Sequence, residues 1–173
     1  MDAMINNKNM FHVLLKEMKE KGIDDIFSVG FIDKENGIYQ FYPIYDSLFI
    51  QVLSYYIKLT IDPITLRFVI GIVDRIDFQF EIEDDMFYSI SSIEDQVLDD
   101  IWAAGNNIKE INLFDFDENN YTCLAIEVTL FNGQKIFFDP SYEFGIKIGG
   151  DRLKQLWIDN TSDSSDRKVK KII

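Results

Sequence analysis

The single histidine and the single cysteine of this sequence are the side chains best suited to acid–base or nucleophilic catalysis near neutral pH, and each lacks the partners that such chemistry requires. His12 is the only histidine, and it falls on the polar side of a helical pattern, which favours a solvated surface residue over a general base. Cys123 lies in an alternating apolar stretch with no second histidine to activate it, so we expect a packed small side chain. Triad chemistry built on cysteine or serine is therefore strongly disfavoured.

A calcium loop is the next candidate, because DFDENN, which starts at Asp115, matches the first ligand spacing of an EF-hand. However, Asn120 stands where the loop needs glycine, and Ile126 stands where it needs a bidentate glutamate. A polar hairpin turn is the better interpretation. Paired carboxylates remain a weaker alternative, because 30 acidic residues always bring some pair together. We therefore predict no catalytic residue, no metal site and no cofactor.

The most unusual stretch is EIEDDMFYSISSIEDQVLDDIW at 81–102, which holds eight carboxylates and no lysine or arginine. Outward strand positions, helix first turns and tight turns explain most of these acids. Asp99 and Asp100 are not explained in this way, because anions are unfavourable near a helix C-terminus. Two interpretations stay open: a solvated acidic face, or a surface that binds a basic protein.

Under the second interpretation we expect one exposed face with Tyr88 at or near its centre. An alternating strand would place Glu81 and Glu83 on the same side about 7 Å apart, and a helix would align Asp95 with Asp99. The sequence leaves open whether strand and helix lie side by side. The expected partner-binding residues are Glu81, Glu83, Asp84, Asp85, Tyr88, Asp95 and Asp99.

The elements that must position these residues follow from hydrophobic periodicity. It predicts helices over 7–21, 47–59 and 92–104, and a short helix after Asp151. It predicts a hairpin across 26–44 and strands over 76–83, 108–116, 121–131, 134–139 and 142–148; residues 62–75 are ambiguous, with strand preferred.

The expected fold is a single α+β domain with a mainly antiparallel sheet and three or four helices, with the 121–131 strand inside the sheet. Residues 1–160 form this domain, and 161–173 form a polar and then basic tail. An edge strand through Val169, Ile172 and Ile173 is an alternative for the end of this tail.

Charge and composition narrow the class of partner. The net charge is −13, and residues 1–166 alone carry 30 acids against 13 bases. Such a body repels phosphate backbones and anionic membranes, so we expect no nucleic-acid or membrane binding and favour a basic protein partner. The N-terminus lacks a signal-peptide pattern, no apolar run approaches the roughly 20 residues of a membrane helix, and the chain has one cysteine. These features predict a cytoplasmic protein.

In its acidity, its EIEDDMFY and IEDQVLDDIW segments and the strand-rich YTCLAIEVTLFNGQKIFFDP, the chain resembles bacterial immunity proteins, including those of contact-dependent growth inhibition systems. The resemblance implies a non-catalytic inhibitor that binds and neutralises a cognate basic toxin domain, such as a nuclease. The alternative is a phage-type nucleic-acid mimic that blocks a DNA-binding enzyme, with carboxylates spaced like phosphates over an elongated surface. A carboxylate-based hydrolase is the least favoured alternative.

Overall fold

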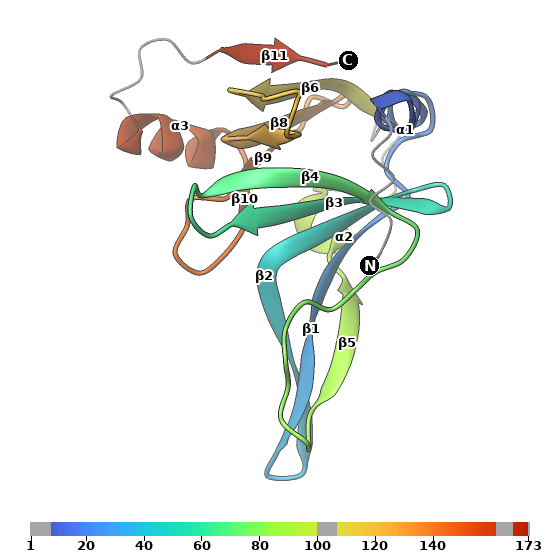
Figure 1. The fold of residues 1–173 in the computed structure, drawn as a ribbon, viewed down its shortest axis with the longest axis vertical. Coiled ribbons are helices and arrows are strands. Elements are labelled where there is room, and N and C mark those ends of the chain that lie inside the picture. The colour runs from blue at the N-terminus through green and yellow to red at the C-terminus, as the bar shows by residue number, and fades with distance from the viewer. Residues whose placement is uncertain (1–7, 100–106, 162–167, 173) are drawn as a thin grey trace.

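Residues 8–99, 107–161 and 168–172 are described by a computed structural model, in which two antiparallel sheets pack against each other. Figure 1 shows the two sheets and the helices around them. The six-stranded sheet has the order β5-β1-β2-β3-β4-β7, and the five-stranded sheet has the order β10-β9-β8-β6-β11. The described strands of the first sheet are β1 (Asp25–Glu35), β2 (Ile38–Val52), β3 (Tyr55–Asp62), β4 (Arg67–Val73), β5 (Phe87–Ser92) and β7 (Thr122–Cys123). Those of the second are β6 (Ile108–Phe114), β8 (Ala125–Leu130), β9 (Lys135–Asp139), β10 (Lys147–Gly149) and β11 (Val169–Lys171).

Helix α1 (Lys8–Lys21) confirms the first predicted helix, and it packs onto the core that the two sheets share. Its apolar positions recur at helical spacing, so one stripe is buried while the opposite face stays polar. The buried stripe consists of Phe11, Leu14, Leu15 and Met18. The same core cluster takes side chains from both sheets, which makes the described chain one α+β domain, as predicted.

The predicted hairpin at 26–44 is confirmed, and it extends beyond the packed sheets (Figure 1). Asn36 and Gly37 both have positive φ, which suits the tight two-residue turn between β1 and β2. The β1–β2 register shifts between Ser28 and Val29, and beyond that shift β2 pairs with β1 but no longer with β3. We call the projecting part, residues 31–42 together with 78–90, the arm.

The predicted helix over 47–59 is wrong: this segment is the end of β2, a turn at Leu53 and the start of β3. Leu48 and Phe49 are adjacent in the chain and both fully buried, because both faces of the strand are covered here. A strand buried on both faces is continuously apolar, and periodicity cannot separate it from a buried helix. The ambiguous 62–75 segment contains β4, so the preference for strand is confirmed.

The other two elements around the acidic stretch also differ from expectation. Residues 76–83 form no strand, although Ile76, Phe78, Phe80 and Ile82 are half-buried as their alternation predicts. The predicted helix over 92–104 is four residues long where it is described, α2 (Glu94–Val97), and it ends at Leu98 in an extended conformation. Its N-cap residue, Ile93, makes no side-chain capping bond. Residues 100–104 lie outside the described part of the chain.

The last third is strand-rich, as predicted, but two elements are divided or shortened. The 121–131 strand splits at Leu124 into β7, in one sheet, and β8, which lies inside the other between β9 and β6. The 142–148 strand is limited to β10. Helix α3 (Asp151–Asn160) begins where expected and lies against β9 and β10, and β11 forms the edge strand that was the alternative for the tail.

Helix α3 covers the outer face of the five-stranded sheet. Its Trp157 ring lies 5.2 Å from the Phe114 ring and 5.4 Å from the Phe137 ring. Lys154, one turn before, donates to the buried carboxylate of Glu127 in β8 at 2.6 Å. A central strand therefore tolerates a glutamate, because the helix supplies its cation.

Candidate functional site

The best candidate site is the arm, where exposed carboxylates and exposed apolar side chains occur together. Glu81, Glu83, Asp84 and Asp85, here called the arm carboxylates, lie on the segment between β4 and β5 and are all exposed. None of them forms an ion pair with a lysine or arginine in the described part of the chain. Their negative charge is therefore presented to solvent without a local counter-ion.

Tyr88 fixes the segment that carries the arm carboxylates to β5. Its hydroxyl donates to the Phe80 carbonyl at 3.0 Å, and its ring centre lies 4.8 Å from that of Phe78 and 5.5 Å from that of Phe80. Nevertheless 46% of Tyr88 remains exposed. Tyr88 thus combines a fixed ring, a satisfied hydroxyl and an accessible apolar surface, which are properties of an interface anchor.

Further large apolar side chains are exposed along the arm. Tyr88, Phe31 and Tyr42 are register neighbours across β5, β1 and β2, and the Phe31 and Tyr42 rings stack with centres 5.3 Å apart. The opposite face carries Tyr39 and Phe87, which are 63% and 59% exposed. In all, five of the large apolar residues that are exposed in the described chain belong to the arm: Ile38, Tyr39, Phe87, Tyr88 and Ile90. Such a concentration of exposed apolar residues is more typical of an interaction surface than of a solvated face.

Asp95 and Asp99 do not lie with the arm carboxylates, although both are exposed as predicted. They follow β5, whereas the arm carboxylates precede it, and this six-residue strand spans about 17 Å. The backbone amide of Asp99 donates to Gln134 in the β8–β9 turn at 3.1 Å, so Asp99 is held at the body of the protein. Because the predicted strand is absent and helix α2 ends at Val97, before Asp99, the geometric argument for one face of six carboxylates fails; the structure shows two groups.

The second acidic group includes two aspartates that sequence reasoning missed. Pairing of β1 with β5 brings Asp24 and Asp25 near Glu94 and Asp95. Burial, and then the charges of Asp25, Asp24 and Asp95, raises the pKa of the Glu94 carboxyl. The signal that was available is FYSIS at 87–91, where apolar and aromatic residues alternate with serine as in a strand.

The residues with catalytic or metal-binding potential have structural roles or remain isolated. Burial raises the pKa of the Cys123 thiol to about 12, so it is not a nucleophile at neutral pH. His12 is exposed on α1. Asp115 forms an ion pair with Arg67 at 2.8 Å, and Asp117 accepts hydrogen bonds from the Asn119 amide and Asn120 side chain, as in a polar turn. No group of three potential metal ligands occurs within the described ranges.

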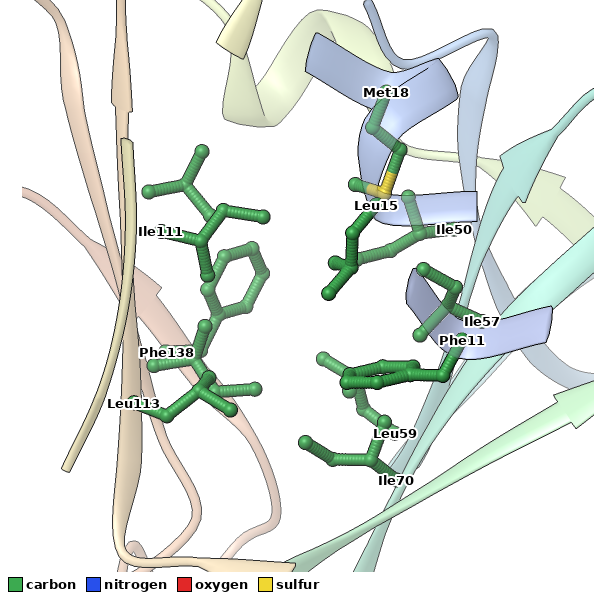
Figure 2. Close-up of a pocket in the computed structure, with 12 residues that line it drawn as sticks. Phe11, Leu15, Met18, Ile50, Ile57, Leu59, Ile70, Ile111, Leu113 and Phe138 are labelled. Carbon is green, nitrogen blue, oxygen red and sulfur yellow. The ribbon is translucent and has the colours of Figure 1, made fainter. Parts of the chain in front are cut away.

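A small cavity of about 30 Å³ lies between the two sheets beside α1. Figure 2 shows side chains of α1 and of both sheets pointing into it, among them Leu15, Ile57 and Leu113. Every lining residue is apolar, so the cavity offers no hydrogen-bond partner to a substrate or to an ordered water. Ligand sites have volumes of roughly 300–1,000 Å³, so this space is a gap in core packing.

No protein-family model, characterised protein or solved structure matches the chain significantly. Among the described helices, none is both long and apolar enough to cross a membrane.

Proposed function

We propose that this protein is a non-catalytic inhibitor that binds a basic protein partner through the arm, in the manner of an immunity protein that neutralises a toxin. The observation that carries the proposal is that unpaired carboxylates and exposed aromatic residues coincide on one projecting element. Carboxylates accelerate encounter with a cationic surface, and buried aromatic anchors slow dissociation. Separate patches would each supply only one of these effects.

The charge of the arm supports a basic partner over a second copy of the chain. Residues 31–42 contain Asp33, Lys34 and Glu35, and residues 78–90 add the arm carboxylates, which gives the arm a net charge of −5. Contact between two such arms would bring two strongly negative surfaces together, with Lys34 as the single cation of each arm. A partner rich in lysine or arginine removes this repulsion.

The proposed setting is the cytoplasm, since the single cysteine is buried and unpaired, as in proteins of a reducing compartment. The partner is proposed to be a toxin domain, with a basic nuclease as the first candidate, because enzymes that act on phosphate backbones present cationic active sites. An acidic arm that covers such a site excludes the nucleic acid without any chemistry of its own.

The test combines capture with reconstitution. The tagged protein is used to capture partners from a lysate of its source organism, in parallel with an arm variant (Glu81→Gln, Glu83→Gln, Asp84→Asn, Asp85→Asn). A matched control neutralises four exposed acids elsewhere (Glu20→Gln, Glu143→Gln, Asp151→Asn, Asp159→Asn). We expect a basic protein that is retained by wild type and control and lost by the arm variant.

The captured protein is then expressed alone and together with this chain. We expect growth arrest when it is expressed alone and growth rescue by wild type but not by the arm variant. Rescue by the arm variant at equal protein level, or a captured partner that is not basic, would overturn the proposal.

A further inference from the structure

Strand β5 has an open hydrogen-bonding edge. It is the terminal strand of the six-stranded sheet and pairs with β1 from Phe27↔Ser92 to Ile32↔Phe87 without a register shift. On its other side, no strand of the described chain pairs with it. A strand edge of this kind is a template for an additional strand.

The register identifies the backbone groups on this open edge. The Ile93 amide donates to the Ile26 carbonyl at 2.8 Å and continues the β1–β5 register by one pair. Backbone groups of alternate residues point to opposite sides of a strand, so Ser91 and Ser89 also face β1. The amides and carbonyls of Tyr88, Ile90 and Ser92 therefore point to the open side.

The other sheet edges are blocked or short, and β5 is not. Among the described edge strands, β7 has two residues and β10 has three, while β11 has three, two of them lysines. The arm half of β2 is also unpaired on its outer side, but there Pro43 lacks an amide hydrogen. In contrast, the β5 sequence FYSISS has no charge, no proline and no bulge, which are the usual means of protecting an edge.

Both ends of this edge are negative. The arm carboxylates precede β5, and Glu94 and Asp95 follow it. The pKa of Glu94 is raised by burial and then by neighbouring aspartates, which agrees with a site that no cation of the described residues neutralises. Between Ile76 and Ile108 the sequence contains no lysine or arginine. An extended segment along β5 would meet apolar side chains at its centre and carboxylates at both ends.

We infer that β5 binds an extended segment of the basic partner as an added strand, with cationic side chains at both ends of the segment and apolar side chains beside Tyr88 and Ile90. The inference rests on the proposed function and specifies how the partner docks. Backbone hydrogen bonds along an open edge supply affinity, and flanking side chains supply specificity. The charge of the arm disfavours a second copy of this chain as the occupant.

The test uses a synthetic peptide as a defined probe, the capped sequence KKVTVTVKK. The matched control peptide has the same sequence but carries methyl groups on the backbone nitrogens of both threonines and the central valine. These methyl groups keep the charge of the peptide and remove backbone hydrogen-bond donors. On the protein, Ile90→Pro removes one outward amide, and Ile90→Val keeps it. Hydrogen exchange of the Ser91 amide, which faces β1, checks that β5 stays paired in each variant.

We expect salt-sensitive binding of the unmodified peptide, with the Ile90 amide becoming protected from exchange in the complex. N-methylation and Ile90→Pro should each weaken binding by at least about tenfold, whereas Ile90→Val, which keeps the amide and removes one methylene group, should weaken binding much less than Ile90→Pro. If Ile90→Pro disrupts the pairing of β5 with β1, the comparison of the N-methylated and unmodified peptides on the wild-type protein is the test of strand addition.

The outcomes separate this inference from the proposed function. Binding that survives N-methylation and Ile90→Pro but is lost in the arm variant would overturn strand addition and leave an acidic docking surface. Binding that is equal in wild type and arm variant, or no binding to wild type at low salt, would count against both.

Discussion

Lys58 Nζ in β3 donates to both carboxylate oxygens of Asp77, at 2.7 and 2.9 Å, and this pair ties the segment that bears the arm carboxylates to the sheet. The Lys58 side chain is 9% exposed, so the ammonium depends on Asp77 for its compensation. Asp77 is partly exposed, which reduces the cost of losing the pair.

Asp77→Asn is therefore expected to lower the free energy of unfolding by about 1.5–3 kcal/mol. The same change should speed amide exchange over 76–86, because the anchor of this segment is lost. Glu83→Gln, at an exposed carboxylate without an ion pair, is the control and should stay within about 0.5 kcal/mol of wild type. Equal effects of the two variants in urea unfolding would show that Lys58–Asp77 is not an anchor.

Gly30 is predicted to be essential for the arm. A Cβ at this position would lie 2.8 and 2.9 Å from two carbons of the Phe41 ring and would also meet the Tyr42 carbonyl. Gly30→Ala should therefore cost about 1–3 kcal/mol through overpacking. Gly71→Ala in β4 should be neutral or slightly stabilising, because no atom other than those of its own residue and its two chain neighbours lies within 4 Å of the added Cβ. Thermal unfolding of the two variants compares them, and similar losses would contradict the close approach.

The cavity between the sheets predicts a stabilising substitution. Val128 lines the cavity, so Val128→Ile adds a methylene group into free space and should raise the free energy of unfolding by up to about 0.8 kcal/mol. Val52 is equally buried but does not line the cavity, and Val52→Ile should destabilise. Urea unfolding measures both, and a loss of stability in Val128→Ile would mean that the cavity is filled.

Cys123 predicts a stability change at alkaline pH. Burial holds its pKa near 12 in the fold, whereas the reference value is 9.0. Between these values the unfolded state loses the proton and the folded state keeps it, so the unfolded state is favoured as pH rises. The contribution amounts to about 1.4 kcal/mol per pH unit above pH 9.

The measurement compares wild type with Cys123→Ala by urea unfolding from pH 8 to pH 10.5. The alanine variant loses packing at all pH values, so the informative quantity is the free energy of unfolding of wild type minus that of the variant at each pH. This difference should shrink steadily above pH 9. Parallel curves would show that the thiol ionises in the folded state.

Much of the fold could be predicted where one face of an element is buried and the turn residues are specific. Helix α1 and the hairpin around Asn36–Gly37 are of this kind. The β2–β3 region could not be predicted, because Leu48 and Phe49 are buried on opposite faces of the strand and the apolar pattern therefore loses its two-residue period. At 76–83 the apolar and polar residues alternate because Phe78 and Phe80 pack onto Tyr88. This packing requires no pairing with another strand.

The candidate site was predicted by residue type but not by arrangement. All seven predicted residues are exposed. For the six carboxylates this follows from their charge, and for Tyr88 it follows from its amphipathic ring. Their division into two groups depends on β5, which is not among the strands predicted from the sequence. The pairing of β1 with β5 is a long-range contact, and no local pattern encodes the partner strand.

The rate of association with the captured basic partner, measured by stopped flow at low and at high salt, tests the central claim most directly. The account predicts that the arm variant associates about tenfold more slowly than wild type at low salt, with the difference vanishing at high salt. Asp95→Asn with Asp99→Asn, at the body end of β5, should have a smaller effect. Association of the arm variant at the wild-type rate, or a larger loss in the Asp95 and Asp99 variant, would contradict the assignment of the arm as the docking surface.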